Sequence, residues 1–245
     1  MGDCIACCRS VSCQCWIEIS FGGDGNFQGV LVMSDETLFG DKTSADWKAA
    51  LDGGNPTEIL FDDFLMPRLN ARYFSPVEKL NVHPDRNNGE GFLIVSALCA
   101  AIEFLGALRQ GTTYAPKLAN APGWEGKGFV ADSRSNAYFS LILGHGVFSG
   151  QFGAYMDDFC SNVRCSLLHD ARTTNNWRIR NDLTSASDAL IVDGDVKRIN
   201  RTALLSLICD YLRAYRLELI KDMDLREKFI QKMNAICESI DTARR

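Results

Sequence analysis

Apolar residues recur at helical spacing in four long segments of the chain. In residues 92–109 they cover most of the helical circumference, which predicts a central helix that is buried on most sides. Residues 149–168 carry an apolar stripe at i, i+3, i+4, i+7 spacing, and residues 200–220 and 224–240 have the same character. The pattern therefore predicts a mainly α-helical bundle over residues 51–245.

Two stretches depart from this pattern and predict β-hairpins. Residues 16–39 contain two β-rich runs that are joined by Gly22-Gly23-Asp24-Gly25, a turn-forming sequence. Within the helical region, residues 177–180 and 189–192 are short β-rich runs, and Asp193-Gly194 follows the second. We interpret the second stretch as a small β-hairpin insertion in the bundle.

A change in composition after Gly40 indicates a domain boundary. Residues 44–51 predict a short helix, and the glycine- and proline-containing residues 53–56 break it. We place the boundary near residue 50. Residues 1–50 then form a Cys-rich N-terminal segment with a hairpin, and residues 51–245 form the helical domain.

Prolines and glycines divide the middle of the chain. Residues 57–65 have a helical period, and Pro67 is expected to limit that helix. Residues 75–78 provide an N-cap serine, a proline at the first helical position and a capping-box glutamate, so another short helix should start there. Residues 110–135 lack sustained periodicity and predict a long loop.

Composition and charge restrict the class of protein. Hydrophobic residues make up 46% of the chain and charged residues 23%, as in soluble globular proteins. The net charge of -5 argues against a broad basic surface, so any nucleic-acid site must be local. No apolar run reaches the roughly 18 residues of a membrane-spanning helix, and the N-terminus lacks the pattern of a secretory signal. We therefore expect a cytoplasmic protein without a membrane partner.

Five of the ten cysteines lie close together at Cys4, Cys7, Cys8, Cys13 and Cys15. A disulfide framework would need an oxidising compartment, for which no targeting signal is present. The spacing of the first pair and of Cys13-x-Cys15 is compatible with tetrahedral zinc, but the pairs are closer than in usual zinc ribbons. We expect reduced thiols and no bound metal, with a zinc-binding regulatory protein as the alternative.

The end of the helix predicted over residues 149–168 carries the candidate chemistry. Asn162, Cys165, Ser166 and His169 fall on one helical stripe, opposite much of the apolar surface. Arg164 lies about 140° from His169 on an ideal helix, so the two converge only if the helix ends, if the arginine reaches around, or if two copies meet. The structural alternative is that both side chains cap the carbonyl end of the helix.

Glu103 is a carboxylate on an otherwise apolar helix. It and Ser96 are the polar interior residues of the predicted central helix and fall on one stripe. A carboxylate in such surroundings needs a cationic or hydrogen-bonding partner. We expect Glu103 to face the region of Arg164 and His169.

The residues around this site resemble a known family. Arg164 and His169, with four residues between them, are similar to the Arg-x(four to six)-His motif of the HEPN superfamily. The wider string Asn162-Val163-Arg164-Cys165-Ser166-Leu167-Leu168-His169-Asp170-Ala171-Arg172-Thr173, followed by Trp177, resembles a run in bacterial proteins of HEPN-like character. The string Met66-Pro67-Arg68-Leu69-Asn70-Ala71-Arg72-Tyr73-Phe74-Ser75-Pro76 is similar to a run in bacterial proteins of HEPN-like character. The similarity covers about residues 50–245.

The resemblance implies a HEPN-like bundle that cleaves RNA without a metal or cofactor, as a homodimer that joins two Arg/His pairs. His169 would move the proton and Arg164 would stabilise the phosphorane, with Glu103, Asn162, Cys165 and Arg172 as supporting or substrate-binding residues. The family also implies a role in phage defence or a toxin system, with an antitoxin or regulatory protein as partner. Many active members carry Asn, Asp or His where this chain has Cys165. The alternative is a non-catalytic module that binds a nucleotide or a partner protein.

Overall fold

The computed structural model describes most of the chain after the N-terminal segment. The predicted Cys-rich cluster, most of the first hairpin and much of the predicted loop over residues 110–135 lie outside the described part. The described residues are 37–81, 89–114, 130–132, 135–180 and 187–243.

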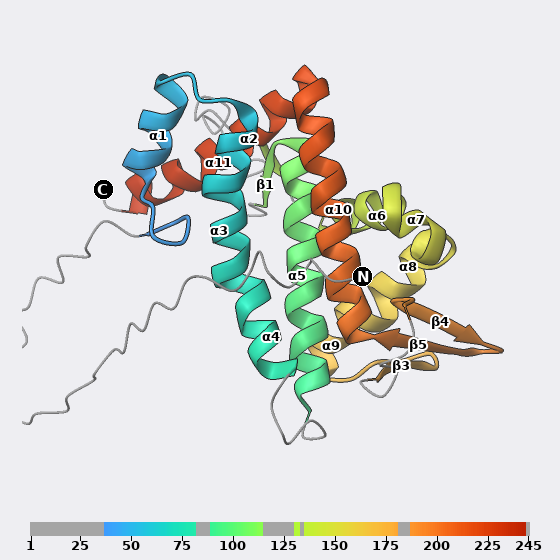
Figure 1. The fold of residues 1–245 in the computed structure, drawn as a ribbon. Helices are drawn as coiled ribbons and strands as arrows, with labels where there is room; N and C mark the ends of the chain where they lie inside the picture. The colour runs from blue at the N-terminus through green and yellow to red at the C-terminus, as the bar shows by residue number, and fades with distance from the viewer. Residues whose placement is uncertain (1–36, 82–88, 115–129, 133–134, 181–186, 244–245) are drawn as a thin grey trace, which may run out of the picture. The chain divides into compact units, whose positions relative to one another are not determined.

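Helices dominate the described residues, as Figure 1 shows. The first half contains α1 (Ser44–Asp52), α2 (Thr57–Leu60), η2 (Phe61–Leu65), α3 (Met66–Leu69), η3 (Asn70–Phe74), α4 (Ser75–Asn81) and α5 (Glu90–Gln110). The second half contains α6 (Ser135–Leu143), α7 (Gly146–Phe152), η5 (Gly153–Tyr155), α8 (Met156–Phe159), η6 (Cys160–Cys165), α9 (Ser166–Asp170), α10 (Arg201–Lys221) and α11 (Met223–Ala243). The mainly α class and the helices predicted over residues 92–109, 200–220 and 224–240 are confirmed.

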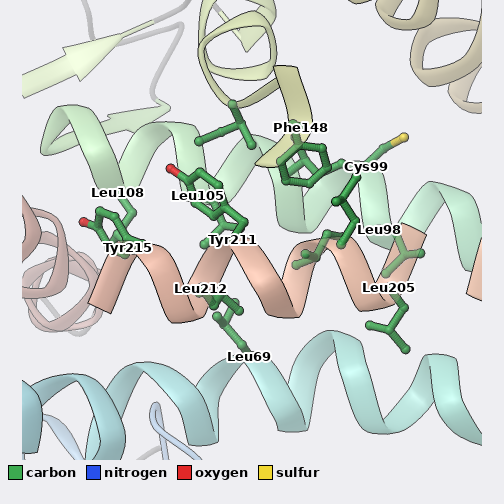
Figure 2. Packing of buried hydrophobic residues seen from close by; sticks show 14 of the residues in the cluster. Leu69, Leu98, Cys99, Leu105, Leu108, Phe148, Leu205, Tyr211, Leu212 and Tyr215 are labelled. Carbon is green, nitrogen blue, oxygen red and sulfur yellow. The ribbon is translucent and has the colours of Figure 1, made fainter. Parts of the chain in front are cut away.

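α5 and α10 form the centre of the helical unit and lie side by side (Figure 1). Figure 2 shows Tyr211 and Tyr215 pointing from α10 toward α5, while Leu212 points toward Leu69 of α3. All four side chains are at most 2% exposed. Because α10 buries side chains on both sides, it joins the α3 layer to the α5 layer through one apolar core.

α5 alone among the described helices is long and apolar enough to cross a membrane by length and composition. In the fold it is a core helix, because ten of its residues are buried, among them Ile94, Leu98, Ile102 and Leu105. The helix ends at Gln110. The next residue, Gly111, has a φ of 69°, the left-handed conformation that glycine often adopts directly after a helix.

A close approach between α5 and α6 depends on Gly106. A Cβ at this position would lie 2.3 Å from the Tyr138 backbone oxygen. The hydroxyl of Tyr138 in turn accepts a hydrogen bond of 2.6 Å from Thr112 Oγ1. The missing side chain thus lets α6 pack directly on the backbone of α5.

The expectation that Pro67 ends a helix is wrong. Helical structure runs from Thr57 to Asn81 without a break, with π-helical turns at η2 and η3. Pro67 lies in the first turn of α3, directly after η2. Proline has no backbone N–H to donate. Because Pro67 lies where the hydrogen bonds change from the π to the α pattern, the missing hydrogen bond destabilises the helix less than it would in a regular α-helix.

The helix predicted over residues 149–168 is a series of short helical pieces from α7 to α9. The bend at Phe152 and Tyr155, where 3-10 geometry replaces the α-helix, separates α7 from α8. α6, which precedes them, was not predicted. Phe139 and Phe159 stack with ring centroids 5.5 Å apart, and Phe152 meets Phe159 edge-on at 5.2 Å. Aromatic packing therefore holds these short helices together.

The predicted hairpin between residues 177–180 and 189–192 is wrong in its pairing. β3 (Trp177–Arg180), β4 (Leu190–Asp193) and β5 (Val196–Asn200) form a sheet in the order β3-β5-β4. β5 pairs parallel with β3 and antiparallel with β4, so the hairpin lies between β4 and β5 around Gly194. A second, parallel pair joins β1 (Thr112–Tyr114) to β2 (Val130–Asp132).

α1 contributes to the helical core although it precedes the predicted boundary. Trp47 is fully buried, and its Nε1–H donates to Asn234 Oδ1 of α11 at 2.7 Å. Its ring meets Phe64 and Phe229 edge-on. The boundary expected near residue 50 therefore falls inside an element that packs with the helices after it.

Candidate functional site

The candidate motif lies where a π-helical turn changes to a short α-helix. η6 ends at Cys165, and Ser166 Oγ donates to the Ser161 oxygen five residues earlier at 3.1 Å. α9 then ends at Ala171, whose φ of 52° is the left-handed conformation that terminates helices. The wider π-turn changes the angular positions expected from an ideal α-helix.

Arg164 forms an ion pair with Glu103 of α5. Arg164 Nη2 donates to Glu103 Oε2 at 2.7 Å, and the two side chains are 18% and 20% exposed. The expectation that Glu103 faces Arg164 is confirmed. Arg164 Nη1 also lies 3.8 Å from Cys165 Sγ. The pair fixes the guanidinium at the rim of the core, where both charges are partly removed from water.

Buried thiols lie in the same region of the core. Burial raises the pKa of Cys160 to about 11 and raises the pKa of Cys99 further. Cys160 Sγ donates to Asn136 Oδ1 at 3.4 Å. Both thiols are therefore neutral near pH 7 and behave as small hydrophobic side chains.

His169 is exposed at the end of α9, beside the exposed Leu168 and Asp170. Within the described part of the chain, no hydrogen bond or ion pair reaches the His169 ring. Arg172 is exposed as well. A single copy of the chain thus holds Arg164 inward on Glu103 and leaves His169 in solvent.

Asn162 and Ser166 do not share a polar face with His169, contrary to the predicted stripe. Ser166 is 8% exposed, and its hydroxyl lies 3.0 Å from Thr174 Oγ1. Thr174 Oγ1 donates to Asn162 Oδ1 at 2.8 Å, and its N–H donates to the Asn162 backbone oxygen. Both residues therefore bind the turn before β3, because the π-turn directs them toward it.

Asp158 is the centre of a polar network. Its carboxylate accepts from Asn162 at 2.7 Å and from Asn175 and Trp177 Nε1 at 3.0 Å, and it pairs with Lys197 at 3.1 Å. Burial alone would raise the pKa of Asp158, but the donors, led by Lys197, hold it below its usual value. The network ties α8 and η6 to the sheet.

A second polar cluster escaped the sequence analysis. Arg109 of α5 donates to Glu218 Oε2 at 2.6 Å, to Tyr211 Oη at 3.3 Å and to His145 Nε2 at 3.0 Å. Arginine has no acceptor, so His145 must accept through Nε2, and a neutral ring carries its proton on Nδ1. Within the described residues that buried Nδ1 has no hydrogen-bond partner.

This second cluster connects three helical segments. Burial, the largest effect, raises the pKa of Tyr211 to about 12, although Arg109 beside it lowers the pKa. The same cause raises the pKa of Tyr215, over whose ring the guanidinium lies at 5.8 Å from the centroid. Both tyrosines are therefore neutral. Arg109 joins α5 to α10 and to the turn before α7 through its contacts with Tyr211, Glu218 and His145, and it lies over the Tyr215 ring.

No metal centre is present among the described residues: they include no group of three or more His, Cys, Asp or Glu side chains that could hold an ion. The alternative zinc site at the N-terminal cysteines lies outside the described part.

Comparisons of the chain with protein-family models, with curated proteins and with solved structures found no match. The similarity to the HEPN motif consequently rests on the residues around Arg164 and His169 and on the string from Met66 to Pro76.

Proposed function

We propose that the protein is a cytoplasmic, metal-independent endoribonuclease of the HEPN type. The observation that carries the proposal is the 2.7 Å contact that holds Arg164 on Glu103, one helical turn before the exposed His169. The contact holds a planar cation five residues before a histidine, the side chain that most often serves as a general acid or base. These are the two groups that cleavage of an RNA phosphodiester needs.

The reaction uses the ribose hydroxyl as its nucleophile. Neutral His169 takes the proton of the 2′-hydroxyl, and the oxygen attacks the adjacent phosphorus. The new P–O2′ bond forms as the P–O5′ bond breaks, and the leaving oxygen takes a proton from the protonated His169 of a second copy. The guanidinium of Arg164 stabilises the negative charge of the phosphorane. The products are a 2′,3′-cyclic phosphate and a 5′-hydroxyl.

A homodimer supplies the arrangement that one copy lacks. Arg164 faces α5 while His169 faces solvent, so two copies related by a two-fold axis at the end of α9 would bring two pairs to one RNA strand. Leu168 supports this placement because it is 59% exposed beside His169. Phe92 and Leu93, 41% and 59% exposed, add apolar surface at the start of α5, a helix that packs on α9.

The biological setting that fits this activity is phage defence or a toxin system. RNA cleavage of this kind must be restrained in its own cell, so an antitoxin or regulatory protein is the expected partner. The net charge of -5 argues against a broad basic surface. RNA would therefore bind at the Arg164 and His169 region alone.

The test is RNA cleavage in EDTA by the parent protein and by two variants on α9. His169→Ala should reduce the rate by about two orders of magnitude or more, the effect of losing general acid–base catalysis. Asp170→Ala is the control, because Asp170 is also exposed on α9 and has no assigned role. Equal cleavage by both variants and the parent would remove the proposal.

The second candidate is a non-catalytic module that binds a nucleotide or a partner protein. It is favoured by the same ion pair, since Arg164 is already engaged by Glu103, and by Cys165 at the position after the motif arginine. Under this alternative, no RNA is cut by the parent protein. Leu168→Asp would then abolish binding of the partner or of the second copy.

A further inference from the structure

Lys232 is a buried lysine on the inner face of α11. The residue is only 7% exposed. Its Nζ donates to Thr113 Oγ1 of β1 over 3.4 Å and lies 5.8 Å from the centroid of the Phe104 ring. An ammonium group has three donors, and one long hydrogen bond to a hydroxyl satisfies only part of this capacity.

Lys232 has no carboxylate partner among the residues that the structure describes. Buried lysines are normally paired, because an isolated ammonium in apolar surroundings loses its hydration without compensation. Burial, followed by repulsion from Arg68, accordingly lowers the pKa of Lys232 to about 8. Among the described residues, Thr113 and the Phe104 ring offset only part of the cost of this positive charge, and no carboxylate compensates it.

Arg68 lies over the Phe104 ring, as Lys232 does. Its guanidinium carbon is 5.8 Å from the centroid of Phe104, and Nη1 donates to the Leu38 backbone oxygen at 2.8 Å. This hydrogen bond fixes the arginine in place. Two cations from α3 and α11 thus lie over the Phe104 ring of α5, and the Thr113 hydroxyl lies beside Lys232.

We propose that Arg68, Lys232 and Thr113 form a binding site for an oxyanion, the phosphate or carboxylate group of a small molecule. An ammonium and an orienting hydroxyl are suited to oxyanions, and the planar guanidinium adds donors in a fixed geometry. A bound anion would supply the negatively charged partner that the described residues do not give Lys232. The site is independent of RNA cleavage, because it uses neither Arg164 nor His169.

The inference is tested by thermal unfolding of the full chain at pH 7 in inorganic phosphate, acetate or chloride at equal ionic strength. Phosphate or acetate should raise the melting temperature of the parent more than chloride does. The more effective anion identifies the ligand class. Lys232→Met should lose this dependence, whereas Lys228→Met, an exposed control on α11, should keep it.

A second measurement separates specific binding from a general salt effect. The pKa of Lys232, followed by NMR of its ε-methylene, should rise from about 8 toward 10.5 when the anion binds. Arg68→Gln should weaken the anion dependence without removing Lys232. An unchanged Lys232 pKa, or an equal anion effect in the parent and in Lys232→Met, would overturn the proposal.

Discussion

Glu103 and Arg164 lie 61 positions apart in the sequence and form an ion pair of 2.7 Å. The pair joins the central helix α5 to the π-turn η6, which directly precedes the helix that carries His169. Each side chain is only about one-fifth exposed. If one of the two is removed, the charge of the other therefore loses this partner without gaining full hydration. The pair therefore both stabilises the fold and sets the position of the motif arginine.

The first prediction is a coupling energy between these two residues. In a double-mutant cycle of Glu103→Gln and Arg164→Met, the interaction should contribute roughly 1–3 kcal/mol to the free energy of unfolding measured in urea. The exposed i, i+4 pair of Asp224 and Lys228 is the control and should give about 0.5 kcal/mol or less. A coupling no larger than that of the control would show that the contact is not maintained in solution.

Asp158 should make the fold sensitive to acid. Its pKa lies below the ordinary value of 3.8 in the folded state, so its stabilisation is present above that value and is lost as the pH falls through the folded pKa. Asp158→Asn should lower the free energy of unfolding at pH 7 by roughly 1–3 kcal/mol and flatten the loss of stability below pH 4. Asp157→Asn, at the exposed neighbour, should leave the urea midpoint and its pH dependence unchanged.

Lys232 should produce a pH dependence of the same sign, but at high pH. Its folded pKa of about 8 lies below 10.5, so the unfolded chain binds more protons between these values and stability rises with pH there. Lys232→Met should remove this rise and increase the free energy of unfolding at pH 7 by on the order of 1–3 kcal/mol in the absence of anions. Unfolding curves at pH 7 and pH 10 measure both effects. A Lys232→Met variant that is less stable than the parent at pH 7 would contradict the account.

Gly106 should not tolerate a side chain. Gly106→Ala places a Cβ 2.3 Å from the Tyr138 backbone oxygen, so α6 must move and the free energy of unfolding should fall by about 1–3 kcal/mol. Gly150→Ala is the matched control in α7, where nothing lies within 4 Å of the added carbon. That substitution should be neutral or stabilise the protein by up to about 1 kcal/mol.

The long helices could be predicted from the sequence because their apolar residues repeat with the α-helical period. The short helices around the candidate site could not be predicted, because the π-turn η6 changes the helical period at the residues that carry the site's side chains. Pro67 shows the same effect. It was expected to end the helix, but it lies inside a continuous helical path, directly after the π-turn η2. The sheet was predicted wrongly for a different reason: pairing between strands depends on distant partners, so the strand β5 and its position between β3 and β4 were not predicted.

The contact of Glu103 with Arg164 could be predicted because a carboxylate on an apolar helix requires a cation. Asp158 gave no such signal, since its donors Trp177 and Lys197 come from strands whose position the sequence did not reveal. Lys232 falls within an amphipathic helix, where a lysine is normally solvated. Its burial follows from packing against α5 and β1, which only the structure provides.

The most direct measurement of the central proposal is single-turnover RNA cleavage in EDTA by His169→Ala, Arg164→Gln and the double variant. Each single change should reduce the rate by about two orders of magnitude or more, and the double variant should be little worse than either, because the residues act as one catalytic unit. The parent's products should carry 2′,3′-cyclic phosphate ends, and circular dichroism should show that all three variants fold. Folded variants that cleave at the parent's rate, or a parent that cuts no RNA, would contradict the account.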